Sequence, residues 1–234
     1  MLRFSREDPL PQDPLPERIA AVGLLLPILL IGVLSAVSRA DGSSVPIPIT
    51  DAGLIQGLGF ELLLTATLGV WLWRAGWRPH LSTTRPYEWL DPARGMLLWA
   101  AAIAAALTWA LACRAVFPDL FRVASQTQIS GAPDFWLSLV FSVYNAVFEE
   151  LLWLGLGITA FRRFGVGWAS AISIAMRLLA HAYQGPLALV TVLPVSILFT
   201  LYYVRTRRLW PVVVAHAFQD TLALSLLGNM SGRV

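Results

Sequence analysis

The chain has 234 residues, of which 57% are hydrophobic and 13% charged, and its formal net charge is +3. Soluble domains carry roughly 25% charged residues, so this composition excludes an ordinary water-soluble domain. It predicts an all-α, polytopic bundle of transmembrane helices, and we expect a lipid environment and no nucleic acid partner. The single cysteine, Cys113, excludes an intramolecular disulfide and any cysteine-based metal cluster, and its apolar flanks predict an inert thiol.

The N-terminal quarter of the chain predicts a tail and one membrane span. Residues 1–17 are polar and rich in proline, which predicts a disordered cytoplasmic tail ahead of a single membrane domain at 18–234. The apolar run at 19–38 is long enough to cross a bilayer. Small residues before Arg39 also suit a cleaved signal peptide, but the run exceeds the usual signal core of about 7–15 residues, which favours an uncleaved helix.

After a Gly/Pro/Ser loop at 40–52, a second span is expected at 54–73. It contains Glu61, which we expect to face other helices and to take no part in catalysis. Residues 74–94 mix Arg, Trp, Tyr and Pro, a composition typical of a segment at the lipid headgroups, and His80 belongs to this segment.

Hydropathy predicts five further spans, at 95–113, 135–161, 167–183, 186–204 and 209–228. Between the third and fourth spans, the polar loop at 114–134 has room for a short helix at 117–124. All 17 basic residues are arginines, and seven spans with the N-terminus inside place twelve of them in cytoplasmic segments and four outside. The remaining one, Arg177, lies within the membrane. We therefore expect an integral protein of a bacterial plasma membrane, with its N-terminus in the cytoplasm.

The stretch FEELLWLG places Glu149 and Glu150 side by side within the fourth predicted span. A charged side chain at mid-bilayer costs about 2.5–3.5 kcal/mol on insertion scales, so intramembrane carboxylates indicate a functional site. Helical periodicity puts Asn145, Glu149 and Trp153 on one stripe.

Two later spans carry polar pairs one helical turn apart, Arg177 with His181 and His216 with Asp220. At 1.5 Å per residue, Glu149 and His181 lie roughly 20 Å from their cytoplasmic loops and His216 roughly 10 Å, all close to the middle of the bilayer. These depths are compatible with one shared site.

Hydrolysis is the chemistry that this set favours. A buried carboxylate can take a proton from an attacking water, and histidines can orient the water, stabilise an oxyanion or protonate a leaving amine. An acid one turn from His216 can fix the tautomer of that ring. A divalent metal such as zinc is the alternative, because Glu149, His181 and His216 form an acceptable ligand set, although the HExxH spacing is absent.

At these residues the sequence resembles the CPBP family of membrane proteases, which includes type II CAAX prenyl endopeptidases and Abi-like bacteriocin-processing or immunity proteins. The family pattern is EExxxR, then FxxxH or RxxxH, then HxxxN or HxxxD. The corresponding residues here begin at Glu149, Arg177 and His216, and the similarity covers about 135–228. The resemblance implies helices around a conical cavity, Glu149 as the water-activating base with His181, and His216 with Asp220 on the oxyanion side. Asn145, Arg177 and Tyr183 are the candidate supporting or substrate-binding residues, and Glu150 belongs to the candidate catalytic set.

One departure from the family pattern concerns its arginine, which falls at Leu154 here. We expect Arg177 to replace it as the partner of Glu150, because an unpaired buried charge is costly. The favoured function is an intramembrane endopeptidase acting on a peptide or membrane-protein substrate. A weakly active or inactive scaffold or immunity protein is the alternative, and a proton-coupled transporter ranks last because no inverted repeat is visible.

Overall fold

The computed structural model describes residues 47–74, 85–126 and 129–231, together with isolated positions between 23 and 37. The described elements in chain order are β1 (Ile47–Pro48), α2 (Asp51–Arg74), α3 (Asp91–Val116), α4 (Pro118–Ser125), β2 (Ile129–Ser130), α5 (Phe135–Glu150), η2 (Leu151–Gly157), α6 (Ile158–Phe161), η3 (Arg162–Phe164), α7 (Val166–Ala180), η4 (Ala182–Gln184), α8 (Pro186–Thr206) and α9 (Trp210–Ser231). The predicted tail at 1–17 and the first predicted span at 19–38 lie outside the continuously described residues.

Within the described ranges, four helical stretches are long and apolar enough to cross a membrane: Asp51–Arg74, Asp91–Val116, Phe135–Phe164 and Pro186–Thr206. The all-α membrane class is therefore confirmed, and these stretches match the second, third, fourth and sixth predicted spans. The fifth predicted span, 167–183, corresponds to α7, an apolar helix of 15 residues, which is shorter than the roughly 20 residues that usually cross a bilayer. The seventh predicted span is the helix α9, which is not among the four, so the count of seven stays a prediction.

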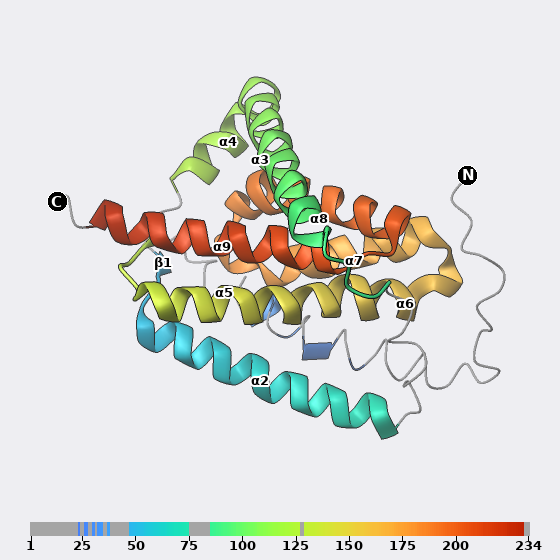
Figure 1. Ribbon diagram of the computed structural model, residues 1–234. Helices are drawn as coiled ribbons and strands as arrows, with labels where there is room; N and C mark the ends of the chain where they lie inside the picture. The colour runs from blue at the N-terminus through green and yellow to red at the C-terminus, as the bar shows by residue number, and fades with distance from the viewer. Residues whose placement is uncertain are drawn as a thin grey trace.

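The centre of the molecule is the pair α5 and α9, which run side by side in Figure 1. Helix α2 packs against α5 from below in this view, and α3 rises above, packed on α9 and α8. The approach of α3 to α9 is close because Gly95 has no side chain. A Cβ atom at this position would lie 2.7 Å from the Cβ of Val214 and 2.8 Å from the Pro211 carbonyl oxygen.

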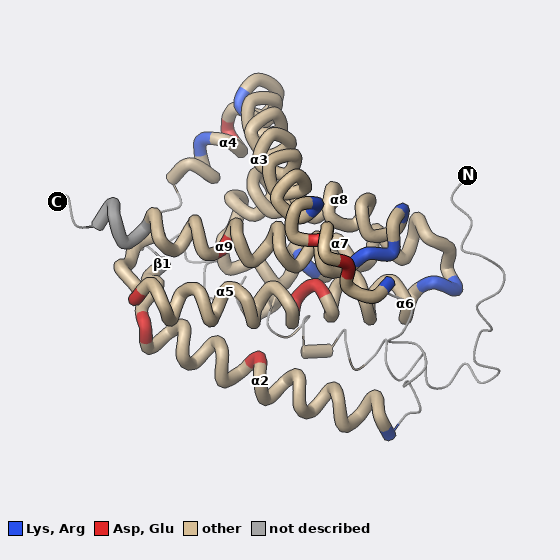
Figure 2. Tube along the Cα trace, viewed as in Figure 1, with Lys and Arg blue, Asp and Glu red and all other residues tan. Residues whose placement is uncertain are grey.

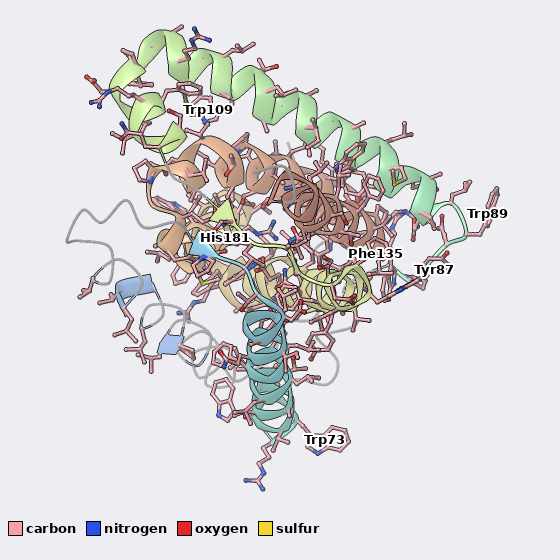
Figure 3. All side chains as sticks on the ribbon, turned by 90° about the vertical axis from the view of Figure 1, so that its left-hand side faces the viewer. Trp73, Tyr87, Trp89, Trp109, Phe135 and His181 are labelled. Atoms are coloured by element: carbon pink, nitrogen blue, oxygen red, sulfur yellow. The ribbon has the colours of Figure 1, made fainter. Side chains whose placement is uncertain are left out.

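The lateral surface of the bundle is apolar. On α2 only Leu54, Glu61 and Leu72 are buried, and residues such as Leu63 are 67% exposed. Tryptophans project from the periphery, with Trp73 and Trp89 pointing away from the bundle in Figure 3. Basic stretches after α6 and after α8 lie toward the same side of the molecule in Figure 2. This distribution suits helices in contact with lipid and charged loops at one membrane surface.

A two-stranded parallel sheet ties the start of α2 to the start of α5. Ile47 pairs with Ile129 and Pro48 with Ser130, and the Ile49 N–H donates to the Ser130 carbonyl at 2.7 Å. The sequence predicted only loops here, because strands of two residues leave no periodic signal.

The N-terminus of α5 is held in place by the carboxylates of Asp134 and Asp51. Asp134 caps the helix by accepting from the Leu137 N–H at 2.9 Å, and the Asp134 N–H donates to Asp51 at 2.8 Å. The first turns of α2 and α5 are therefore held together at one end of the bundle.

The long span containing the paired glutamates is not one continuous α-helix. Its extent agrees with the prediction of 135–161, but residues Leu151–Gly157 form a π-helical stretch directly after Glu150. Hydroxyl groups form hydrogen bonds with two backbone carbonyls of this stretch. Ser173 Oγ donates to the Trp153 carbonyl at 2.7 Å, and Thr159 Oγ1 donates to the Gly155 carbonyl at 2.7 Å. Such stretches are frequently found at functional sites. Leu154, at the family arginine position, is fully buried within it.

Candidate active site

A cavity of about 580 Å³ lies between α2, α5, the end of α7 and α9, with the two short strands at its wall. Its polar lining includes Glu61, Asn145, Glu149, His181, His216 and Asp220. Apolar and aromatic residues, including Phe60, Phe141 and Tyr183, form much of the remaining wall. The structure therefore brings both predicted imidazoles and one of the paired glutamates to a common polar pocket inside an apolar bundle.

Glu149 is held on the cavity wall by the residue one turn further along the chain. Trp153 donates from its indole Nε1 to Glu149 Oε2 at 3.1 Å, as the predicted stripe implied. The indole is 2% exposed, so it is a rigid anchor for the carboxylate. Because this bond uses Oε2, the other oxygen can turn toward the cavity.

His181 lies one residue beyond α7, whose end it caps, and it is half-buried near the centre of the view in Figure 3. Its Nδ1 lies 2.9 Å from the Arg177 carbonyl oxygen. A carbonyl only accepts, so Nδ1 carries the proton, and Nε2 of the neutral ring is the basic nitrogen. Tyr183 packs against the ring, with centroids 6.2 Å apart and planes at 25°.

His216 is held between two carboxylates. Its Nδ1 lies 2.7 Å from Glu150 Oε1 and its Nε2 lies 3.3 Å from Asp220 Oδ2. Asn145 donates to the same Asp220 oxygen at 3.1 Å. Carboxylates accept, so only the doubly protonated imidazolium can donate to both neighbours. The sequence predicted the contact with Asp220, but the contact with Glu150 was not foreseen.

The predicted partnership of Arg177 with Glu150 is confirmed. Arg177 Nη2 lies 2.5 Å from Glu150 Oε2, and the two side chains are 5% and 0% exposed. Glu150 thus joins Arg177 on α7 to His216 on α9. Arg177, from another helix, thus supplies a counter-charge to Glu150 although position 154 is a leucine.

The paired glutamates have different surroundings. Successive residues of a helix point about 100° apart, so one of two neighbours can face a cavity while the other faces the core. Glu149 lines the cavity, whereas Glu150 is fully buried behind it and does not. Glu150 was placed in the candidate catalytic set, but its geometry is that of a positioning residue for His216.

From the sequence, Glu61 was expected to face other helices and to take no part in catalysis. The structure places it on the cavity wall. It is 9% exposed and comes from α2, far from the motifs in sequence. An ionisable residue inside an apolar span was the available signal, but the second span carried no motif to connect it with the site.

The geometry of the cavity does not suit the zinc alternative. Both ring nitrogens of His216 face carboxylates, so this ring offers no free nitrogen to a cation in this arrangement. Throughout the described ranges, no three His, Cys, Asp or Glu side chains are grouped closely enough to hold a metal ion. The set of Glu149, His181 and His216 therefore does not fit a metal as it is arranged here.

Comparison with known proteins identifies the part of the chain that holds most of the site. Residues 131–222 match the family model described as Type II CAAX prenyl endopeptidase Rce1-like. No curated protein and no solved structure matches the chain. The matched stretch includes Asn145, Glu149, His181, His216 and Asp220 of the cavity wall, whereas Glu61 lies outside it. The chain is an integral membrane protein, and its residues 131–222 are similar to the Rce1-like branch of the CPBP family of proteases.

Proposed function

We propose that this protein is an intramembrane endopeptidase that hydrolyses a peptide bond with a water molecule activated by Glu149 and His181. The observation that carries the proposal is that both side chains line one cavity inside an apolar helical bundle. The family match supports a peptidase. A peptide segment or a membrane protein, entering from the bilayer or its surface, is the substrate class that fits this setting.

In the proposed reaction, the Glu149 carboxylate takes a proton from a water molecule as its oxygen attacks the peptide carbonyl carbon. His181 accepts a hydrogen bond from the same water through Nε2, because its Nδ1 proton is committed to the Arg177 carbonyl. The proton held by Glu149 then passes to the leaving amine as the C–N bond breaks. Trp153 fixes the carboxylate for both transfers.

The His216 imidazolium is proposed to stabilise the oxyanion of the tetrahedral intermediate. A fixed positive charge beside a developing negative charge is effective in a cavity of low dielectric, since no reorganisation is needed during the reaction. Glu150 and Asp220 keep this ring charged and oriented, and Arg177 balances the charge of Glu150. We place the protein in a bacterial plasma membrane with its N-terminus in the cytoplasm, on the arginine distribution.

The test is cleavage by purified protein in proteoliposomes, measured with internally quenched peptide libraries. Glu149→Gln keeps the size and the Trp153 contact but removes the base, and we expect at least a 100-fold loss of rate, the lower limit for general base catalysis. Asp119→Asn is the matched control, because Asp119 is exposed on α4 and away from the cavity. Equal rates for Glu149→Gln and wild type would rule out this mechanism. Full biological activity of Glu149→Gln would instead favour the scaffold or immunity role.

A further inference from the structure

Glu61 is a buried carboxylate that the proposed reaction does not use. Its side chain lines the cavity, the residue is 9% exposed, and its Oε2 atom has no hydrogen-bond partner among the described residues. Leaving a buried carboxylate oxygen without a partner costs free energy. A bound ligand that supplies a donor at this position would remove that cost.

The position of Glu61 is set by a contact between helices. Thr65 Oγ1 donates to the Glu61 carbonyl oxygen at 2.7 Å and accepts from the Tyr144 hydroxyl on α5 at 3.0 Å. The turn of α2 that carries Glu61 is therefore tied to α5, the helix that also carries Glu149. A carboxylate on a fixed helical turn can serve as a recognition group with a defined position.

The electrostatic surroundings of Glu61 favour a cationic ligand. Glu149 and Asp220 lie close enough to add negative charge beside Glu61. His216 adds positive charge, but it is itself held by Glu150 and Asp220. The cavity wall thus carries three carboxylates, of which Asp220 contacts His216 and Glu149 accepts from Trp153. Glu61 has neither kind of contact at its Oε2 atom, so it is the carboxylate best placed to receive a positive group from a ligand.

We propose that Glu61 forms an acidic subsite that binds an arginine or lysine side chain of the substrate beside the scissile bond. This inference rests on the proposed function for the nature of its occupant, a peptide. Glu61 lies outside residues 131–222, so the chain's own N-terminal part supplies the specificity element while the family-matched part supplies the chemistry. A guanidinium or ammonium group reaching Oε2 makes a charge-assisted hydrogen bond in a water-poor pocket, which is the strong class of such bonds.

The test uses internally quenched decapeptide libraries in which one position at a time is fixed as arginine, norleucine or glutamate. With wild-type protein in proteoliposomes, we expect cleavage to be about tenfold faster or more for arginine than for norleucine at one position beside the scissile bond, and slowest for glutamate. Glu61→Gln should abolish this preference, so that the arginine and norleucine libraries are cleaved at equal rates. Asp119→Asn should leave the preference unchanged.

Binding provides an independent measurement. In the Glu149→Gln background, affinities for the same libraries should show the same preference for arginine, and adding Glu61→Gln should remove it. Cleavage without any arginine preference would overturn the Glu61 subsite and leave the peptidase proposal standing. An arginine preference in binding without any cleavage would support the Glu61 subsite and overturn the peptidase proposal. Absence of both cleavage and binding would overturn both proposals, and an arginine preference that survives Glu61→Gln would assign the subsite to another residue.

Discussion

The buried contact between Arg177 and Glu150 gives the sharpest stability prediction. Arg177→Met replaces the arginine with an apolar side chain, and among the residues that the structure describes it leaves the fully buried Glu150 with His216 as its partner. Removing one member of a buried ion pair typically costs about 3–5 kcal/mol, because the remaining charge stays desolvated and uncompensated. Since the two side chains are 5% and 0% exposed, solvent cannot take over the role of the arginine. We therefore expect Arg177→Met to lower the free energy of unfolding by about this amount.

The assay is reversible unfolding in mixed detergent micelles, titrated with sodium dodecyl sulfate and followed by far-ultraviolet circular dichroism. Arg122→Met is the matched control, because Arg122 forms an exposed contact with Asp119 at 3.5 Å on α4. Exposed ion pairs contribute about 0–1 kcal/mol, so this variant should unfold almost as the wild type does.

A second variant separates pairing from loss of packing. Glu150→Gln alone leaves Arg177 buried without a counter-charge, whereas the double variant of Arg177→Met with Glu150→Gln leaves no charge in excess. We expect the double variant to be more stable than the sum of the two single changes implies, by about 1.5 kcal/mol or more. Additive costs, or a cost for Arg177→Met no larger than for Arg122→Met, would refute the argument that this pair holds α5 to α7.

The remaining predictions concern helix packing and the loop before α3. Gly95→Ala places a Cβ 2.7 Å from the Val214 Cβ and should destabilise the fold by roughly 1–3 kcal/mol. Gly59→Ala places a Cβ with no described atom within 4 Å, so it should stabilise α2 through the higher helix propensity of alanine. Thermal unfolding of the two variants, measured in the same detergent, should therefore shift in opposite directions. Hydrogen bonds from Arg208 and Arg94 hold the pKa of Glu88 below its ordinary value of 4.5. The contribution of Glu88 to stability is thus present above that value and lost as the pH falls through the lowered pKa, so wild type and Glu88→Gln should differ at pH 7 and converge in acid.

The sequence correctly predicted the features that depend on runs of apolar residues and on the spacing of residues along one helix. The spans at α2, α3, α5 to α6 and α8 follow from runs of apolar residues, because such runs must satisfy their backbone groups as helices in lipid. The contacts of Trp153 with Glu149 and of Asp220 with His216 follow from residues one turn apart. The contact of Arg177 with Glu150 was inferred from the cost of two unpaired buried charges, and it is present.

Other features were decided by the tertiary structure, because they depend on contacts between segments distant in the chain. Glu149 and Glu150 cannot be told apart from the sequence. In the folded protein α5 packs on α9 and the π-helical stretch packs on α7, so that Glu149 faces the cavity and Glu150 faces Arg177 and His216. Glu61 belongs to a span without any recognisable motif, and it reaches the same cavity because α2 packs on α5. Local periodicity fixes which residues share a helix face, but the rotation and depth of each helix follow from side-chain packing across the whole bundle.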